Sequence, residues 1–202
     1  MVKNIIFDLG NVLVNVHYDK FFKDLINAGI EPPDVYRFFN DSLLRGKFES
    51  GQMSRMEFLR YVKLKIGKNV PRRVFLKHFT EVFSEITQMK ILISRLSKKK
   101  QFKMFLLSNT NPIHFEYIRE QFPHLNLLHK FGLSYKYKIL KPDPRLYKKV
   151  LRDFKIKAKE TLFIDDLKDN CKTAQKLGFN VIHFRTFNSF KKEFDKFLEE
   201  NR

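Results

Sequence analysis

Five short apolar segments alternate with amphipathic helical patterns, and this alternation constrains the fold of the chain more than any other feature. The predicted strands are residues 2–9, 103–107, 132–134, 161–164 and 180–184. Ile5, Ile6 and Phe7 are apolar side by side, which is typical of a strand covered on both faces. Strands separated by helices predict an α/β fold, with a doubly wound parallel sheet and helices on both of its faces.

One long stretch interrupts the alternation. From about residue 17 to residue 86 the apolar side chains follow helical spacing. Ser54 and Glu57 have the S-x-x-E form of a capping box, which begins a helix. The last positions of the pattern are Phe75, Phe79, Val82, Phe83 and Ile86. We therefore expect an all-helical domain over residues 16–87, inserted between residues 1–15 and 88–202 of the α/β core.

Polar side chains follow the predicted strands at the points where the strands end. They are Asp8, Ser108, Asn109, Lys141, Asp165 and Asp166. In an open α/β sheet, ligands bind in the crevice beyond the carboxyl ends of the strands. Carboxylates that meet there repel one another unless a hard cation joins them, and Mg²⁺ takes carboxylates, carbonyls and water as ligands. Together with a lysine, such a site would neutralise a phosphoryl group that one carboxylate attacks.

Four segments, residues 5–12, 107–111, 141–147 and 163–170, occur in an order that resembles a known family. They are similar to the four motifs of the haloacid dehalogenase-like (HAD) hydrolase superfamily, and the similarity covers essentially the full chain. It implies a Rossmann-like core with a helical cap after the first motif. Within capped subfamily I, the sequence looks most like the small bacterial sugar-phosphate phosphatases of the α-D-glucose-1-phosphate phosphatase type.

The resemblance implies a Mg²⁺-dependent phosphatase that forms an aspartyl-phosphate on Asp8. Asp8 would be both the nucleophile and a ligand of Mg²⁺. The backbone carbonyl of Gly10 and the carboxylate of Asp166 would be further ligands, with Asp165 nearby as a ligand or an orienting residue.

The resemblance also implies the residues that bind the phosphate group. Ser108 and the backbone of Asn109 would hold its oxygens, and Lys141 would contact both the phosphate and the nucleophile. The expected substrate is a small phosphorylated metabolite such as glucose 1-phosphate. The cap would set substrate choice, and the sequence leaves open whether Tyr18, Arg45 or Lys47 faces the cleft.

The sequence departs from most phosphatases of the superfamily at Gly10. Those enzymes carry a second aspartate two residues after the nucleophile, which acts as general acid and base. Glycine cannot protonate a leaving alcohol, so poor leaving groups should be hydrolysed slowly. An anomeric hydroxyl is more acidic than a primary one. We therefore expect glucose 1-phosphate to be preferred over glucose 6-phosphate.

Three other functions stay open at this point. A 2-haloacid dehalogenase would use Asp8 on carbon, but such enzymes need no metal and lack a paired acid like Asp165-Asp166. A phosphomutase normally keeps the acid that Gly10 replaces. The chain could also be a catalytically weak or silent binding protein that retains the fold.

The net charge of the chain at first suggests binding to nucleic acid. Its 202 residues include 40 Lys and Arg against 22 Asp and Glu, a formal net charge of +18. The charge is dispersed rather than gathered in one stripe, which argues against specific nucleic-acid binding.

No apolar run predicts a membrane span. A single cysteine, Cys171, suits a packed position in a cytoplasmic protein, and we expect a monomer or a weak homodimer.

Overall fold

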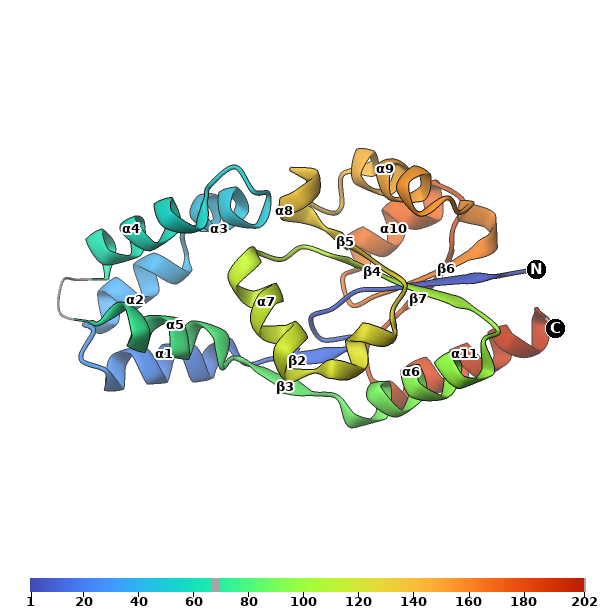
Figure 1. Cartoon of the computed structure of the whole chain (residues 1–202), viewed down its shortest axis with the longest axis horizontal. Helices are drawn as coiled ribbons and strands as arrows, with labels where there is room; N and C mark the ends of the chain where they lie inside the picture. Colours follow the sequence, from blue (N-terminus) through green and yellow to red (C-terminus); the bar gives the residue numbers. More distant parts are fainter. Residues whose placement is uncertain (67–69, 202) are drawn as a thin grey trace.

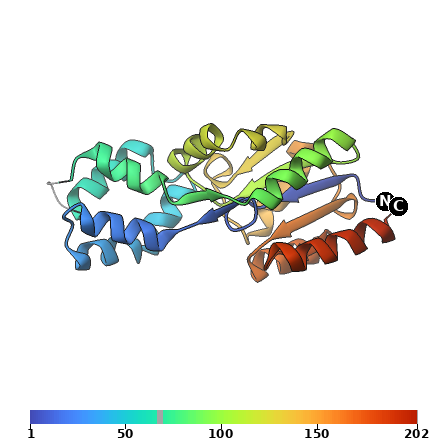
Figure 2. The same cartoon turned by 90° about the horizontal axis from the view of Figure 1, so that it is seen from below.

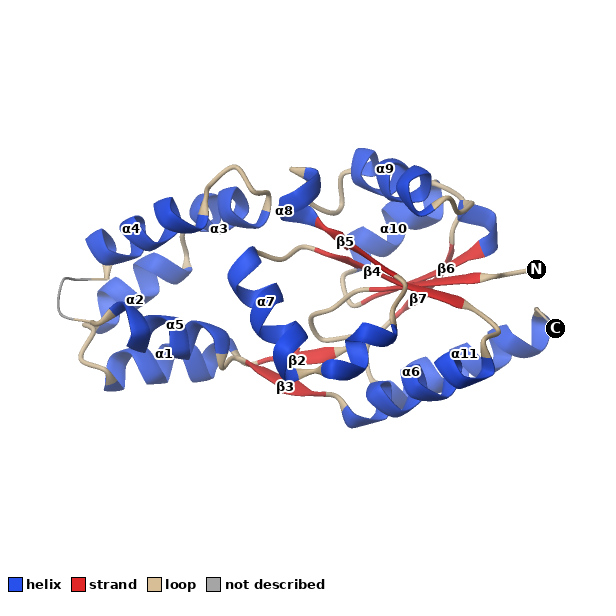
Figure 3. Ribbon diagram, in the orientation of Figure 1, coloured by secondary structure: helices blue, strands red, loops and turns tan. Residues whose placement is uncertain are grey.

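The computed structural model describes residues 1–66 and 70–201, and its central element is a five-stranded parallel sheet (Figure 1; Figure 3). The strands are β1 (Asn4–Phe7), β4 (Lys103–Ser108), β5 (Lys130–Leu133), β6 (Thr161–Asp165) and β7 (Asn180–His183). Their order across the sheet is β5-β4-β1-β6-β7. The predicted α/β fold is confirmed. Because β1 lies between β4 and β6, the residues that follow these three strands meet at one edge of the sheet.

Helices cover both faces of this sheet. On one face lie α6 (Thr87–Lys99), α7 (Pro112–Gln121) and α11 (Phe187–Glu200), and on the other lie α9 (Pro144–Phe154) and α10 (Lys168–Lys176). Figure 1 shows α9 and α10 above the strands and α6 and α11 below them. Within β1 the side chains alternate. Ile5 and Phe7 pack in the core under α6 and α11, whereas Ile6 packs with Tyr147 of α9.

A separate helical unit lies beyond the carboxyl ends of the strands (Figure 1; Figure 2). Its helices are α1 (Tyr18–Asn27), α2 (Pro32–Phe39), α3 (Ser42–Glu49), α4 (Arg55–Lys65) and α5 (Arg72–Thr80). They surround their own apolar core, which is rich in phenylalanine. The rings of Phe48 and Phe58 stack with centroids 4.0 Å apart, and Phe75 stacks on Phe79. The phenylalanines that recur at helical spacing in the sequence are thus the side chains that form this core.

The expectation of an all-helical insert is wrong at its ends. Phe83–Glu85 forms the short strand β3 instead of continuing a helix, and it pairs antiparallel with β2 (Val14–Val16). The amide of His17 also donates to the carbonyl of Val82 at 2.7 Å. This ribbon carries the chain into and out of the helical unit (Figure 3). The apolar spacing of Val82 and Phe83 fits a strand as well as a helix, because such a short segment does not separate the two periods.

The turn after α3 docks the helical unit on the core. Gly51 has a φ of +65°, and a Cβ at this position would lie 2.1 Å from the carbonyl oxygen of Tyr135. Tyr135 belongs to the short helix α8 (Ser134–Tyr137), which the sequence patterns did not predict. The position therefore requires glycine both for its backbone angle and for this close approach.

The part of the chain that the structure describes contains no helix long and apolar enough to cross a membrane.

The capping box predicted at Ser54 is present: Ser54 Oγ accepts from the amide of Glu57, and the Glu57 carboxylate accepts from the amide of Ser54. Replacing Ser54 with alanine should lower the free energy of unfolding by about 1 kcal/mol. The measurement is urea unfolding followed by circular dichroism. Ser94→Ala, inside α6, is the matched control and should change stability by less than about 0.5 kcal/mol. Equal effects of the two substitutions on the free energy of unfolding would contradict the role of Ser54 as the N-cap of α4.

Candidate active site

The polar residues predicted at the strand ends gather around Asp8. Asp8 follows β1, and its amide donates to the carbonyl of Ile164 at 2.8 Å, so the backbone is fixed against β6. The side chain is buried, and its Oδ1 lies 2.8 Å from Nζ of Lys141. Burial raises the pKa of Asp8 to about 7, against the attraction of Lys141. The carboxylate is thus held in a buried position beside the ammonium group of Lys141.

Lys141 joins three strand ends through one buried ammonium group. Its Nζ lies 2.8 Å from Asp8 Oδ1 and 2.7 Å from Asp165 Oδ2, and it donates to the carbonyl of Leu107 at 2.9 Å. These three acceptors use all three N–H donors of the ammonium. Burial alone would lower the pKa of Lys141, but Asp8 and Asp165 outweigh it and raise the pKa. Lys141 therefore stays charged and holds the two carboxylates together.

The loop that carries Lys141 is fixed by Asn109. The side-chain amide of Asn109 donates to the carbonyl of Lys141 at 2.9 Å, and its oxygen accepts from the amide of Lys141 at 2.8 Å. Asn109 follows Ser108, the last residue of β4. The pair of hydrogen bonds ties the loop after β5 to the end of β4. The side chain of Asn109 thus positions Lys141, and the backbone of Asn109 stays a predicted phosphate ligand.

The two adjacent carboxylates after β6 differ in their surroundings. Asp165 is fully buried and accepts from the side chain of Asn170 at 2.9 Å and from the amide of Leu167 at 2.8 Å, besides its contact with Lys141. Asp166 is half-buried and accepts from Asn11 at 3.2 Å. Burial raises the pKa of Asp166. Asp165 is therefore held by several donors, whereas Asp166 keeps more of its carboxylate open to a ligand.

Asp8, Asp165 and Asp166 form a candidate metal centre. Each offers a carboxylate oxygen, and the three oxygens lie within 4.8 Å of one another. Hard oxygen donors at this spacing suit Mg²⁺, which is commonly held by one or two carboxylates, a carbonyl and water. The donor set therefore fits the expected metal. The carbonyl of Gly10, two residues after Asp8, stays a predicted ligand.

Ser108 lies beside this group. Strand β4 ends at Ser108 and lies beside β1, which Asp8 follows. The register of the two strands pairs Phe7 with Leu106. The side chain of Ser108 is buried, and its Oγ lies 3.3 Å from the carbonyl of Asn109. This long contact leaves the hydroxyl capable of serving a ligand at the same edge of the sheet.

Sequence reasoning missed three supporting residues. Asn170 and Asn11 hold the carboxylates of Asp165 and Asp166, and both fall inside segments whose motifs were recognised. Ser134 Oγ accepts from the amide of Thr110 at 2.9 Å and lies 2.6 Å from the carbonyl of Glu49, so it links the core to the helical unit. Asn170 could have been predicted from its place five residues after Asp165, within the same motif. Nothing in the sequence marks Ser134.

Cys171 is a packed residue beside the site. Its thiol donates to the carbonyl of Asp165 at 3.4 Å. Burial raises the pKa of the thiol to about 12, so it stays protonated near neutral pH and is a poor nucleophile.

Replacing Lys141 with methionine should lower the free energy of unfolding by about 3–5 kcal/mol, because Asp8 and Asp165 would stay buried without a cation. Urea unfolding in the presence of a chelator measures the effect without a metal. Lys172→Met removes an exposed lysine that pairs with Asp169, and should cost less than about 0.5 kcal/mol. A loss for Lys141→Met as small as that of the control would contradict the described role of the ammonium.

The chain is similar to a known family of hydrolases and to one of its named members. A model of haloacid dehalogenase-like hydrolases matches residues 2–178. The chain is 29% identical over 188 residues to a D-ribitol-5-phosphate phosphatase of Bacteroides thetaiotaomicron, covering 90% of this chain and 91% of that protein. The finer resemblance to α-D-glucose-1-phosphate phosphatases stays a prediction.

Solved structures are similar over most of their length. A HAD family enzyme from Bacteroides thetaiotaomicron aligns with a TM-score of 0.86 at 28% identity, covering 96% of this chain and 98% of that chain. The wild-type protein in complex with magnesium and inorganic phosphate aligns with a TM-score of 0.84 at 28% identity, covering 94% and 99%. The magnesium that the sequence resemblance implies is thus present in a relative.

A more distant structure shares the fold alone. An L-2-haloacid dehalogenase from Xanthobacter autotrophicus aligns with a TM-score of 0.66 at 14% identity, covering 97% of this chain and 83% of that one. The sequence resemblance to the superfamily is confirmed by the family model, which spans most of the chain. This chain belongs to the haloacid dehalogenase-like hydrolase family.

Proposed function

We propose that this protein is a Mg²⁺-dependent phosphatase that hydrolyses the phosphate ester of a small metabolite, with Asp8 as its nucleophile. The observation that carries the proposal is the buried contact of Asp8 with Lys141, grouped with Asp165 and Asp166 at the ends of adjacent strands. The adjacent carboxylates Asp165 and Asp166 after β6 support a phosphatase rather than a 2-haloacid dehalogenase, because dehalogenases lack a paired acid there. The magnesium and phosphate complex of a 28% identical relative supports the same function.

Asp8 and Lys141 would perform the first step. A carboxylate oxygen of Asp8 attacks phosphorus, the ester P–O bond breaks, and the alcohol leaves as an alkoxide that takes a proton from water. Lys141 keeps the Asp8 carboxylate oriented and adds positive charge near the phosphoryl group. Ser108 and the backbone of Asn109 would hold phosphoryl oxygens.

Water completes the reaction. It attacks the phosphorus of the aspartyl-phosphate, the bond between phosphorus and the Asp8 oxygen breaks, and inorganic phosphate leaves with the Asp8 carboxylate restored. Asp8, Asp166 and the carbonyl of Gly10 would hold Mg²⁺, with Asp165 beside them. The ion supplies positive charge that neutralises the phosphoryl oxygens.

The helical unit, residues 16–87 in this proposal, acts as the cap of the site. The Gly51 turn and the Ser134 contact support this role, since both hold α3 against the core. The β2–β3 ribbon supports it as well, because it connects the cap to the core beside the site.

Asp8→Asn should lower phosphate release by at least about a thousandfold, because an amide is a far weaker nucleophile than a carboxylate. The measurement is phosphate release from an aryl phosphate with added Mg²⁺, and a chelator should abolish the activity of the unchanged protein. Asp169→Asn is the matched control, since Asp169 is an exposed carboxylate on α10 that contacts Lys172. Equal activity of the two variants would exclude Asp8 as the nucleophile.

The glycine at position 10 should favour esters of acidic alcohols. We expect kcat/KM for glucose 1-phosphate to exceed that for glucose 6-phosphate by at least about tenfold, within the about 10²–10⁴-fold that a general acid contributes. D-ribitol 5-phosphate belongs in the same assay, because a relative is named for it. A clear preference for the 6-phosphate would overturn the argument from Gly10.

A further inference from the structure

A basic groove lies at the amino-terminal edge of the sheet, at the opposite end of the strands from Asp8. It encloses about 680 Å³. Lys3 precedes β1, Lys103 begins β4, and Lys157 lies shortly before the start of β6. Figure 1 shows the N-terminus of the chain at this end of the molecule and the helical unit at the other. The groove is therefore separate from the candidate active site.

Five exposed lysines line this groove, and most of them have no acidic partner. They are Lys3, Lys100, Lys103, Lys155 and Lys157. The carboxylate that lines the groove with them is Glu160, whose Oε1 lies 3.7 Å from Nζ of Lys3. Within residues 1–66 and 70–201, the other four lysines form no ion pair. The groove thus holds an excess of positive charge that the protein itself does not neutralise.

Helix ends explain the positions of two of these lysines. Lys100 and Lys155 are the C-cap residues of α6 and α9, where a positive charge is favourable beside the helix dipole. Lys3, Lys103 and Lys157 differ, because they lie at or just before the beginnings of adjacent strands. The amide of Lys103 donates to the carbonyl of Lys3 at 2.9 Å, so these two residues are neighbours across the edge of the sheet. Like charges side by side repel one another, and a bound anion would remove this cost.

The charge of the groove favours a chain of linked phosphoryl groups as its ligand. A single phosphate ester carries at most about two negative charges, fewer than the four lysines that lack an acidic partner. Linked phosphoryl groups carry more charge and extend over more than one strand start. Leu127, which is 40% exposed, and Ile156 add an apolar part to the same groove. The aromatic ring of Phe102 is buried and cannot stack on bases, which argues against a single-stranded nucleic acid.

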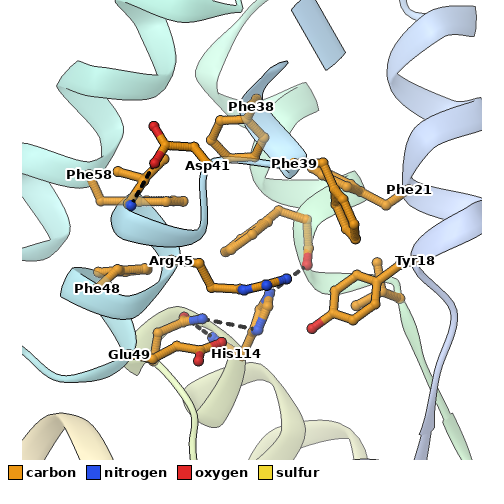
Figure 4. Close-up of a pocket in the computed structure, with 14 residues that line it drawn as sticks. Tyr18, Phe21, Phe38, Phe39, Asp41, Arg45, Phe48, Glu49, Phe58 and His114 are labelled. Carbon is orange, nitrogen blue, oxygen red and sulfur yellow. Dashed lines mark hydrogen bonds between the residues drawn. The ribbon is translucent and has the colours of Figure 1, made fainter. Parts of the chain in front are cut away.

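A pocket in the helical unit is a poor alternative site for such an anion (Figure 4). It encloses only about 50 Å³, and phenylalanine rings form much of its wall. Its basic side chain, Arg45, lies near the acidic side chain of Glu49 (Figure 4). A chain of phosphoryl groups therefore has neither the room nor the positive charge there that the groove at the amino-terminal edge offers.

We propose that the basic groove binds a polyphosphate anion, at a site that is separate from the proposed phosphatase centre and does not depend on it. The lysine ammonium groups would donate charge-assisted hydrogen bonds to the phosphoryl oxygens. A nucleoside triphosphate and an inorganic polyphosphate share this chemistry. They differ in the nucleoside, which Leu127 and Ile156 would contact.

The test measures the binding of adenosine triphosphate and of tripolyphosphate by isothermal titration calorimetry, at about 0.15 M salt and with a chelator in place of Mg²⁺. The double variant Lys103→Ala with Lys157→Ala should bind both anions at least about tenfold more weakly, because two charged donors are lost. Lys148→Ala with Lys149→Ala is the matched control, since it removes two exposed lysines of α9 that do not line the groove. The control should change both affinities by less than about twofold. Tighter binding of adenosine triphosphate would identify a nucleotide as the ligand, and tighter binding of tripolyphosphate an inorganic polyphosphate.

Three results would overturn the proposal. The unchanged protein could bind neither anion under these conditions. The two double variants could have equal effects, which would assign any binding to the net charge or to another site. A single-stranded oligonucleotide could bind more tightly than both anions and lose affinity in the Lys103 and Lys157 double variant, which would assign the groove to nucleic acid. Because the binding measurement needs no hydrolysis, a failure of the proposed phosphatase function would leave this test unaffected.

Discussion

The ammonium group of Lys141 is the interaction on which the site depends. It contacts Asp8, Asp165 and the carbonyl of Leu107, which lie at the carboxyl ends of three adjacent strands. Two carboxylates and one ammonium in a buried position gain little net stability, because the cost of removing charges from water offsets their attraction. An arrangement of this kind is better explained by chemistry than by folding. In the proposed phosphatase it would hold the carboxylate of Asp8 in a buried place for attack and keep positive charge beside the phosphoryl group.

Much of this arrangement could be predicted from the sequence, for a definite reason. A parallel sheet brings the carboxyl ends of its strands to one edge, so Asp8, Ser108 and Asp165 had to meet once their segments were recognised as strands. Lys141 was harder, because it lies in a loop and its position depends on the side chain of Asn109. The different surroundings of Asp165 and Asp166 could not be predicted, since they arise from donors that fold back from α10 and from the loop after β1.

The connection between the two parts of the molecule was also beyond the sequence. Val14–Val16 and Phe83–Glu85 are three-residue strands separated by the whole helical unit, so neither has a recognisable period by itself. Each becomes a strand only because the other is present. The contact between Ser134 and the carbonyl of Glu49 could not be predicted either, because the two residues are 85 positions apart in the chain. Long-range pairs of polar groups leave no local pattern.

The net charge of +18 has little part in this chemistry. The groups that would act are mainly carboxylates, gathered at the strand ends in a basic protein. A basic surface can raise the encounter rate with anionic esters, an effect that salt weakens.

The most direct test of the account is to identify the covalent intermediate. The protein is mixed with Mg²⁺ and a rapidly hydrolysed phosphate ester, quenched in acid, digested and analysed by mass spectrometry. We expect one added phosphoryl group on the peptide that contains Asp8. Turnover with the phosphoryl group on another residue, or with none trapped on any peptide, would contradict the central role of Asp8.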